Sequence, residues 1–391
     1  MHLVFVTSLV PDGTLTTGYE IANAAIIDGL RRAGVKVSVV GFTWPGKQPI
    51  DPDNTVLLGS VDVQTHTASA KQRLLWLGRA IVEGHTFSSV KLRKAGEARV
   101  RQALQKLEPF DGYVLNGVTL AGAYPELFRN KPSIFVAHNV EHQSATENAA
   151  AARSLVERLL YTREARLLKQ LEAKLCGQAD FVFTLAEDDR APLGIADDRL
   201  SATLPLTTRK TAPAPLPSRQ PTYDLALIGT WTWQPNRIGL DWFLQRVVPH
   251  LPDDMTVKIA GHAPPGLRSD HPGVQFVGRV KDATDFVRGA KVIPLISQAG
   301  SGVQLKTIET FELGMPAVAT RSSLRGIADV PENCTVADDP AAFALALTHA
   351  TRLRLPEGDG RGFHAAQMTA MDRQILRGLA ALSFALRRQA A

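Results

Sequence analysis

The sequence predicts an α/β protein made of two domains, each built on a parallel β-sheet. The chain has 391 residues, roughly twice the ~100–200 residues expected of one domain. Short continuous apolar runs, which are typical of buried parallel strands, alternate with amphipathic stretches of helical length. A proline-rich segment at 205–221 divides the chain into halves of similar size, because dense proline favours an extended linker.

Both halves repeat the same pattern of an apolar strand, a glycine-containing loop and a helix. In the first half, strands are predicted at 3–7, 35–41, 112–116, 133–137 and 181–184. In the second half, they are predicted at 225–229, 257–260, 274–277, 292–295, 317–320 and 335–337. Helices are expected over 18–33, 236–250 and 361–388. This alternation predicts parallel sheets covered on both faces, with ligands bound at the carboxyl ends of the strands.

The charge of the chain is concentrated in one segment. The net charge is +6, yet residues 71–106 alone contain nine lysines and arginines against two glutamates. The rest of the chain is therefore close to neutral, which argues against a nucleic-acid-binding surface. Apolar residues lie between these cations, an arrangement that suits an anionic membrane surface. An ordinary solvated helix face over a buried leucine stripe remains the alternative.

Several classes of function lack their motifs in this chain. No G-x-G-x-x-G, Walker-type G-x-x-x-x-G-K-[ST] or G-x-S-x-G motif is present, and no His, Cys, Asp and Glu cluster has metal-ligand spacing. We therefore expect no metal. Cys176 and Cys334 lie far apart, which excludes a disulfide framework and suits a reducing compartment. No apolar run reaches the ~20 residues of a membrane helix. The expected location is cytoplasmic, with peripheral attachment to the inner face of the membrane.

The stretch at 293–320 carries the most chemical information. A predicted strand ends in a loop that contains Gly300, Ser301 and Gly302, and a helix follows. Glycines before a helix N-terminus allow backbone N–H groups to converge on an anion. Lys306 and Glu309 share one face of this helix and can bind a phosphate and a ribose diol, respectively. The alternative is a solvated helix with an ion pair between these two side chains.

The loop after the first strand of the second half offers further candidates. Gly229 and Thr230 permit close approach of a ligand to the backbone, and Asn236 is a suitable N-cap for the following helix. Arg237 lies in the first helical turn, where a cation is disfavoured unless an anion is near, so it is a candidate diphosphate contact or simply an exposed arginine. Trp231 can stack on a ligand or pack at the strand end.

In the first half, His138 directly follows the predicted strand at 133–137. A histidine at this edge of the sheet can donate a hydrogen bond to a hydroxyl or move a proton near neutral pH. Glu141 can orient His138, bind the substrate, act as a base, or simply favour the start of a helix. Thr17 and Gly18 precede the first helix and lie at the same predicted edge.

The stretch GSGVQLKTIETFELGMPAVAT resembles the donor-binding signature of family-4 glycosyltransferases (glycosyl transferases group 1), which have the GT-B fold. The resemblance covers 223–320 well and the amino-terminal half more weakly. It implies two Rossmann-like domains that face an inter-domain cleft. Residues 1–208 would bind the acceptor, a proline-rich linker would occupy 209–222, and residues 223–370 would bind the donor. The final helix is expected to cross back, so that 371–391 packs on the first domain.

The resemblance also implies an activity. It is transfer of a sugar from a UDP- or GDP-sugar to a hydroxyl of a glycan or lipid-linked glycan, with retention and without a metal or further cofactor, in bacterial-type polysaccharide or glycolipid biosynthesis. The donor residues would be Gly229, Thr230, Arg237, Gly300, Ser301, Gly302, Gln304, Lys306 and Glu309. The acceptor residues would be Thr17, Gly18 and His138, and the catalytic residues His138, Glu141 and Lys306.

The chain departs from the family pattern at one position. Ser301 stands where the family has a sugar-contacting glutamate, which leaves the donor sugar and the stereochemical outcome open. Two other functions remain as alternatives. A nucleotide-sugar epimerase of the same fold would use His138 and Glu141 as its acid and base. A non-catalytic sugar- or lipid-binding protein is the other alternative, which the presence of Lys306 and Glu309 disfavours.

Overall fold

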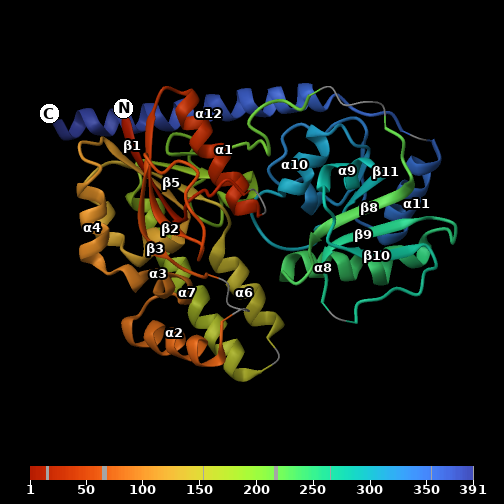
Figure 1. The fold of residues 1–391 in the computed structure, drawn as a ribbon, viewed down its shortest axis with the longest axis horizontal. Helices are drawn as coiled ribbons and strands as arrows, with labels where there is room; N and C mark the ends of the chain where they lie inside the picture. Colours follow the sequence, from red (N-terminus) through yellow and green to blue (C-terminus); the bar gives the residue numbers. More distant parts are fainter. Residues whose placement is uncertain are drawn as a thin grey trace. The chain divides into compact units, whose positions relative to one another are not determined.

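The computed structural model describes residues 1–14, 17–63, 68–152, 154–214, 219–264, 266–353 and 355–390. The chain forms two compact units (Figure 1). The first contains Met1–Leu206 together with Thr369–Ala391, and the second contains Thr207–Met368. Within the proline-rich linker that the sequence predicts, residues 215–218 lie outside the described residues.

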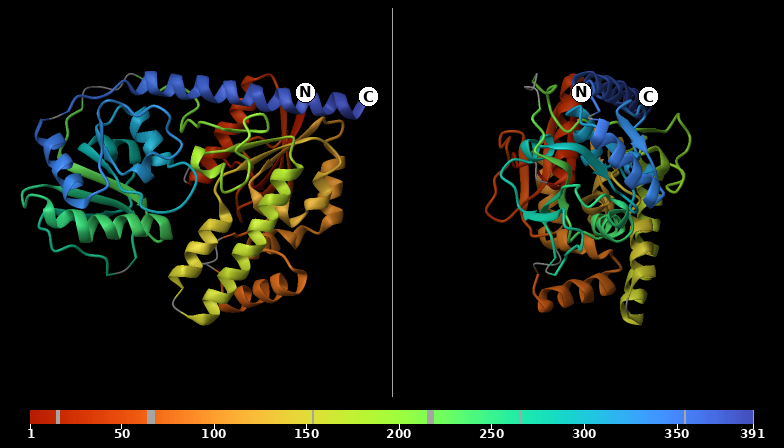
Figure 2. Two further views of the ribbon diagram at one scale, coloured as in Figure 1. Left: turned by 180° about the vertical axis from the view of Figure 1, so that it is seen from behind. Right: turned by 90° about the vertical axis from the view of Figure 1, so that its right-hand side faces the viewer.

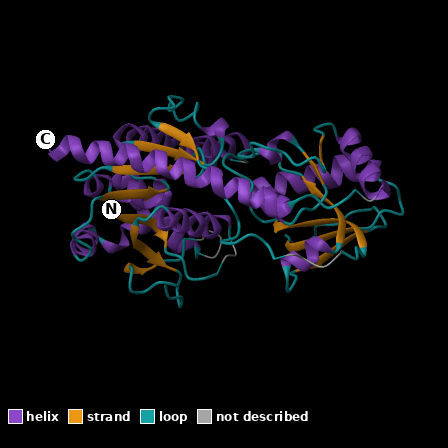
Figure 3. Cartoon of the chain, turned by 90° about the horizontal axis from the view of Figure 1, so that it is seen from above, coloured by secondary structure: helices purple, strands orange, loops and turns teal. Residues whose placement is uncertain are grey.

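A seven-stranded parallel sheet forms the centre of the first unit, with the strand order β3-β2-β1-β4-β5-β6-β7. Its strands are β1 His2–Leu9, β2 Lys36–Thr43, β3 Thr55–Ser60, β4 Gly112–Asn116, β5 Ser133–Ala137, β6 Phe181–Thr184 and β7 Ser201–Thr203. Its helices are α1 Gly18–Arg32, α2 Ala70–Glu83, α3 Phe87–Leu92, α4 Glu97–Gln105, α5 Val118–Ala123, α6 Glu141–Ala151 and α7 Leu155–Gln178. Helices lie on both faces of the sheet (Figure 3). The central strands are therefore buried on both sides, as their continuous apolar sequences require.

The C-terminal helix α12 (Gly360–Ala390) packs on the first unit through its second half. Gly378 faces the ring of Phe183 so closely that a Cβ atom there would lie 2.7 Å from it. Arg32 of α1 forms an ion pair of 2.6 Å with Asp372 of α12. Close packing and polar contacts thus place α12 beside α1 on one face of the sheet.

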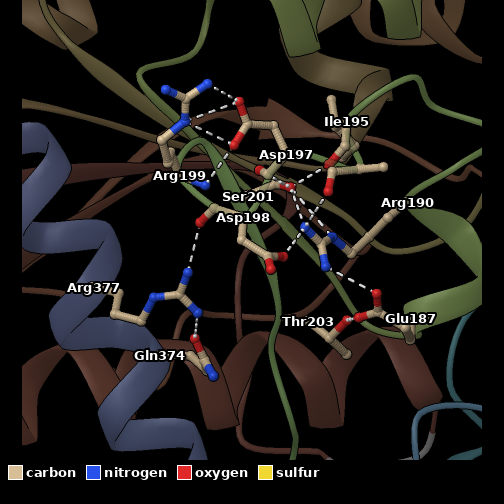
Figure 4. A network of polar contacts seen from close by, with 11 residues as sticks. Glu187, Arg190, Ile195, Asp197, Asp198, Arg199, Ser201, Thr203, Gln374 and Arg377 are labelled. Atoms are coloured by element: carbon tan, nitrogen blue, oxygen red, sulfur yellow. Dashed lines mark hydrogen bonds and ion pairs between the residues drawn. The ribbon is translucent and has the colours of Figure 1, made fainter.

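A second polar cluster fastens α12 to the loop between β6 and β7 (Figure 4). Arg377 donates a hydrogen bond of 2.6 Å to the carbonyl oxygen of Asp198. Arg190 belongs to this loop, and its buried side chain pairs with the carboxylates of Glu187 at 2.9 Å and Asp198 at 2.6 Å. A buried guanidinium needs such partners. The loop is therefore fixed both by its own Arg190 and by Arg377 of α12.

The second unit contains a six-stranded parallel sheet with the order β10-β9-β8-β11-β12-β13. Its strands are β8 Tyr223–Thr230, β9 Val257–His262, β10 Val274–Gly278, β11 Ala290–Leu295, β12 Ala317–Ala319 and β13 Cys334–Val336. Its α-helices are α8 Gln234–Trp242, α9 Ala283–Arg288, α10 Leu305–Glu312 and α11 Pro340–Leu353. Two Rossmann-like parallel-sheet domains, as the sequence predicts, are therefore confirmed.

The structure differs from the sequence prediction at a few elements. Every predicted strand is present, but β3 and β7 were not predicted, and both lie at the edges of their sheet. Helix α8 begins two residues earlier than expected, so that Trp233 rather than Asn236 occupies its N-cap position. The helix predicted over 236–250 continues past α8 as a π-helical turn and then a 3₁₀ turn. None of the helices within the described ranges has both the length and the hydrophobicity to span a bilayer.

The basic segment 71–106 does not form a single charged face. Lys91 is buried, and its ammonium donates to a backbone carbonyl at 2.9 Å and lies beside two aromatic rings. Arg79 and Arg93 both pair with Glu83, at 2.6 Å and 3.0 Å. The exposed cations of the segment other than Arg79 are Lys71 and Arg73 on α2, Lys94 after α3, and Arg99, Arg101 and Lys106 on or directly after α4.

Candidate functional site

A pocket lies in the second unit at the carboxyl ends of β8 and β11, between the N-terminal parts of α8 and α10. Its polar lining side chains are Asn236, Ser297, Gln304, Lys306, Thr307, Glu309, Thr310 and Ser323. Its apolar lining comes from β8 and β11 and from Trp231, Pro235, Val287 and Ile296. Open parallel sheets bind ligands at this edge, so the pocket stands where a ligand is expected.

Lys306 is the cation of this pocket. Its Nζ lies 3.2 Å from Asn236 Oδ1 and 5.3 Å from the centroid of the Trp231 ring. The amide of Asn236 also donates to the carbonyl oxygen of Thr230 at 3.1 Å, which keeps its oxygen turned toward the lysine. Burial lowers the pKa of the Lys306 ammonium to about 8. No described carboxylate forms an ion pair with Lys306, so its charge is available to an anion.

Glu309 is the carboxylate of the pocket, one helical turn after Lys306. The two side chains do not form the ion pair that would mark an ordinary solvated helix. Instead, Glu309 Oε1 lies 3.7 Å from Nη2 of Arg209. Burial raises the pKa of Glu309, and the guanidinium of Arg209 opposes that increase. Arg209 lies 100 residues earlier in the chain, and nothing in the sequence indicated this contact.

The segment that carries Arg209 is fixed against α10. Glu312 is buried, and its carboxylate accepts hydrogen bonds from the backbone N–H (2.9 Å) and the hydroxyl of Thr208. His364 Nε2 lies 3.0 Å from the carbonyl oxygen of Arg209. Burial raises the pKa of Glu312, because its hydrogen bonds only partly replace the lost water. These contacts position Arg209 beside Glu309.

The loop before α10 contains the predicted glycines. Gly300 and Gly302 have φ angles of +94° and +73°, a left-handed backbone that favours glycine. Arg325 braces this loop, with its guanidinium donating to the carbonyl oxygens of Gly302 and Ala299 at 3.3 Å each. The described pocket lining includes Gln304 but not the loop residues 300–302. Arg325 is a loop-positioning residue that the sequence did not indicate.

Hydroxyl groups connect the end of β11 with α10. Ser323 donates to the carbonyl oxygen of Leu295 at 2.8 Å and accepts from the N–H of Ser297 at 2.8 Å. Thr307 of α10 donates to the carbonyl oxygen of Ser323 at 2.7 Å. Thr320 completes the cluster by donating to the carbonyl oxygen of Ser297 at 2.6 Å. These hydrogen bonds connect the end of β11 to the first turn of α10, which carries Lys306.

The loop after β8 differs in part from its sequence interpretation. Trp231 is buried, and its indole N–H donates to the carbonyl oxygen of Ala260 at 2.8 Å. It packs at the strand end, although one face also lines the pocket. Arg237 forms an ion pair of 2.7 Å with Asp241 on the next turn of α8 and is not among the lining residues. Thr230 is exposed.

His138 lies at the carboxyl edge of the sheet in the first unit. Its Nε2 lies 2.8 Å from Oδ1 of Asn116, and its ring centroid lies 5.0 Å from that of Tyr19. Burial lowers the pKa of His138 to about 4, so the imidazole is neutral at physiological pH. Asn116, rather than Glu141, orients this ring.

Glu141 belongs to a separate cluster at the start of α6. It accepts a hydrogen bond of 3.2 Å from the amide of Asn139, and burial raises its pKa. The backbone N–H groups of Glu141 and His142 donate to the buried carboxylate of Glu172 at 2.6 Å and 3.3 Å. His142 Nδ1 also lies 2.6 Å from Glu172. Glu172 on α7 thus caps α6, and His142 is part of that cap.

Thr17 and Gly18 begin α1. The Thr17 hydroxyl accepts from the N–H of Glu20 at 3.3 Å, and the Glu20 carboxylate accepts from the N–H of Thr17 at 2.9 Å, which together form a capping box. Trp44 also donates to Glu20 at 3.2 Å. Thr17 and Gly18 are exposed, and the Thr17 hydroxyl already caps the helix. Residues 15–16 of the preceding loop lie outside the described residues.

Fold and pocket define a two-domain α/β protein of the GT-B type. Residues 222–352 match the family model of Glycosyl transferases group 1. The second unit therefore contains a domain of the glycosyl transferases group 1 type, as the resemblance of its sequence implied, and the chain as a whole has the GT-B fold. No curated protein sequence matches the chain.

Solved structures share this fold over almost the whole chain. Sucrose-phosphate synthase from Thermosynechococcus elongatus has 15% identity and a TM-score of 0.65, with 98% of this chain and 99% of that chain covered. TarM has 12% identity and a TM-score of 0.59, with 97% and 98% covered. HepE of Anabaena, solved with UDP, has 13% identity and a TM-score of 0.58, with 97% and 100% covered.

Proposed function

We propose that the protein transfers a sugar from a nucleotide-sugar donor to a hydroxyl of a glycan or lipid-linked glycan. The reaction would retain the anomeric configuration, need no metal, and serve polysaccharide or glycolipid biosynthesis. The observation that carries this proposal is the pocket of the second unit, where Lys306 and Glu309 lie one helical turn apart and no described carboxylate forms an ion pair with the Lys306 ammonium. HepE was solved with UDP and with UDP-glucose, which supports a UDP-sugar as donor, although a GDP-sugar fits the same groups.

Each group of the pocket has a role in this proposal. Glu309 would accept hydrogen bonds from the ribose hydroxyls, since its partner Arg209 is distant enough to be displaced. Lys306 and the backbone of the loop 300–302 would face the diphosphate, with Gln304 beside them. Negative charge grows on the departing diphosphate as the glycosidic bond breaks, and a preorganised cation in a partly dry pocket stabilises it. Arg237 would contact the diphosphate only after its ion pair with Asp241 breaks.

The first unit would supply the acceptor groups. His138, neutral at physiological pH, would hydrogen-bond a hydroxyl of the acceptor or of the donor sugar. Glu141 would bind the acceptor or act as a base. It is protonated more readily than an ordinary carboxylate, because burial raises its pKa. Gly18 would contribute through its backbone, whereas the hydroxyl and the N–H of Thr17 would first have to leave the capping box of α1.

A nucleoside diphosphate of the correct base is expected to raise the melting temperature of the protein, and Glu309→Ala is expected to weaken this effect. A ligand at 100 times its Kd stabilises by about 2.7 kcal/mol, which corresponds to a shift on the order of 5–10 °C. Losing a hydrogen bond to a charged group costs about 1.5–3 kcal/mol, or roughly 10- to 100-fold in Kd. Thermal-shift measurements with UDP, GDP and ADP give the comparison.

The matched control for this measurement is Glu332→Ala, which removes an exposed carboxylate of the same unit. It is expected to respond like the wild type. If none of the nucleotides shifts the wild type, or if Glu309→Ala responds as strongly as Glu332→Ala, the donor site is assigned incorrectly.

We propose further that the first unit attaches to the cytoplasmic face of an anionic membrane through α2 and α7. Seven large apolar side chains there are each more than half exposed: Leu74, Leu75, Ile81 and Val82 on α2, and Leu155, Val156 and Leu159 on α7. We call this set the α2–α7 surface. The α2 members recur at helical spacing and form one stripe. Both elements lie at the same end of the unit (Figures 1 and 2), and Arg163 of α7 donates to the carbonyl oxygen of Ala80 at 2.6 Å.

Charge supports a lipid surface as the occupant. Lys71 and Arg73 are exposed on α2, and Arg158 is exposed between the apolar residues of α7. Apolar side chains that insert between lipids while neighbouring cations contact anionic headgroups are the usual basis of interfacial binding. Each cation near the surface contributes about 1 kcal/mol. A lipid-linked acceptor would reach the enzyme at such a surface.

Vesicles of phosphatidylcholine with anionic phosphatidylglycerol are expected to sediment the wild-type protein, and pure phosphatidylcholine is expected to sediment much less of it. The double variant Leu74→Ser and Leu75→Ser is expected to bind about 100-fold more weakly or worse, because burial of each leucine side chain contributes about 1.5–3 kcal/mol. The control pair is Leu345→Ser and Leu353→Ser, which changes equally exposed leucines of α11.

Binding that ignores the lipid charge would contradict the membrane proposal. Equal loss in the α2 and α11 variants would also contradict it. Self-association that depends on Leu74 and Leu75, without vesicle binding, would instead identify a second copy of the chain as the occupant.

A further inference from the structure

A buried polar cluster lies behind His138 in the first unit. Thr7, Asn23 and Asn116 are almost completely buried, and with Tyr19 they connect β1, α1 and β4 to the histidine ring. Asn116 donates to Asn23 Oδ1 at 2.7 Å, and Asn23 donates to the Thr7 hydroxyl at 3.2 Å. Buried polar groups of this kind are normally satisfied, and each donor must face an acceptor.

The orientation of both amides follows from one backbone group. Asn23 faces the carbonyl oxygen of Leu9 at 3.4 Å, and a carbonyl can only accept, so the NH₂ group of Asn23 must point there. Its oxygen therefore faces Asn116, which must present its own NH₂ group. Thr7 agrees with this order, because its hydroxyl donates to the same Leu9 carbonyl and accepts from both amides.

This order fixes the proton on His138. With its NH₂ group turned toward Asn23, Asn116 presents its oxygen to the histidine, 2.8 Å from Nε2. An amide oxygen has no proton to give, so Nε2 must carry the hydrogen. A neutral imidazole has one N–H and one lone pair, and the lone pair is consequently on Nδ1. The described residues offer Nδ1 no hydrogen-bond partner.

We propose that Asn23 and Asn116 are positioning residues that hold His138 as the Nε2–H tautomer, with Nδ1 presented to accept a hydrogen bond from a substrate hydroxyl. The assignment of that hydroxyl to a sugar substrate rests on the proposed function. The tautomer itself follows from the geometry of the first unit alone.

Two further features suit this role. The ring of Tyr19 lies against the imidazole at an interplanar angle of 41° and limits its rotation. Gly117, which follows Asn116, leaves room beside the ring, since a Cβ atom there would already lie 4.0 Å from Cδ2 of His138. Because burial lowers the pKa of His138 to about 4, the ring is a weak base. It is therefore suited to orient a hydroxyl rather than to retain its proton.

Nitrogen-15 NMR of the histidine side chains tests the tautomer without any substrate. Protein labelled with ¹⁵N-histidine is expected to show, for His138, a protonated Nε2 and an unprotonated Nδ1 at pH 7. The signal is assigned by its loss in His138→Gln. A protonated Nδ1, or an imidazolium with two protonated nitrogens, would overturn the inference whatever the enzyme does.

Variants then test the two asparagines. Asn23→Ala removes the acceptor that orients Asn116, so His138 is expected to become a mixture of both tautomers. Asn130→Ala is the matched control, because Asn130 accepts a hydrogen bond of 2.9 Å from Tyr113 in the same unit without contacting the cluster. It should leave the His138 signals unchanged. Unchanged His138 signals in a folded Asn23→Ala variant would overturn the proposed positioning role of Asn23.

Kinetics separate this inference from the proposed function. Asn23→Ala is expected to lower kcat about 10-fold or more while the KM for the donor stays the same. A merely structural defect would instead change both parameters. If the wild type has the expected tautomer but His138→Gln retains full activity, the positioning of His138 by Asn23 and Asn116 is correct and the proposed role of His138 in the reaction is wrong.

Discussion

Replacing Gly261 with alanine is expected to destabilise the second unit by about 3–5 kcal/mol, a large effect for a single methyl group. Gly261 pairs with Gly229, one residue before the end of the parallel pairing of β8 and β9, and has a φ angle of +109°. An ideal Cβ atom at this position would lie 1.9 Å from the carbonyl oxygen of Gly229. Because that atom belongs to the backbone, it cannot move without breaking the strand pairing that supports the loop to Trp231 and α8.

Gly278→Ala separates backbone strain from steric overlap. Gly278 has a φ angle of +69°, and no atom lies within 4 Å of the Cβ position. It should lose only about 1–2 kcal/mol, the usual cost of a left-handed conformation. Differential scanning calorimetry should show a decrease on the order of 10 °C for Gly261→Ala. A similar, small decrease in both variants would mean that the two strands tolerate separation.

The strands of both sheets could be predicted because their sequences are apolar without interruption. A strand that is buried on both faces, such as β1 or β11, shows this pattern regardless of its neighbours. The edge strands β3 and β7 could not be predicted in this way. Each pairs on one side only. The apolar run of β3 is limited to residues 56–58, and β7 contains three residues, of which only Ala202 is apolar.

The candidate site divides in the same way between local and distant contacts. Lys306 and Glu309 were predicted because their three-residue spacing on one helix is visible in the sequence. The partners that define their chemistry come from elsewhere: Asn236 is 70 residues from Lys306, and Arg209 is 100 residues from Glu309. Asn23 and Asn116 are 93 residues apart. Contacts of this kind depend on which strand ends meet, and a single sequence does not show that.

Lys306→Met is expected to lower kcat/KM for the donor sugar by about 100- to 1000-fold, the usual effect of losing one preorganised group that stabilises developing negative charge. Release of the nucleoside diphosphate from the donor gives the measurement. Methionine keeps the length and the contact with Trp231, so that the charge is the main change. Lys281→Met, which removes an exposed lysine of the same unit, is the control and should be silent.

The pH dependence of nucleoside diphosphate binding identifies Lys306 more specifically than the loss of rate. The diphosphate needs the protonated ammonium, and the pKa of Lys306 in the free protein is about 8. Above that pH, binding must first return a proton to the lysine, so the affinity should fall about tenfold per pH unit. Lys306→Met should bind weakly and equally at all pH values between 7 and 9.5. Lys306→Arg keeps its charge over this range. Its affinity should therefore also be independent of pH, but higher than that of the methionine variant. Calorimetric titration at several pH values measures all three, and a wild-type affinity that does not fall above pH 8 would show that Lys306 does not contact the diphosphate.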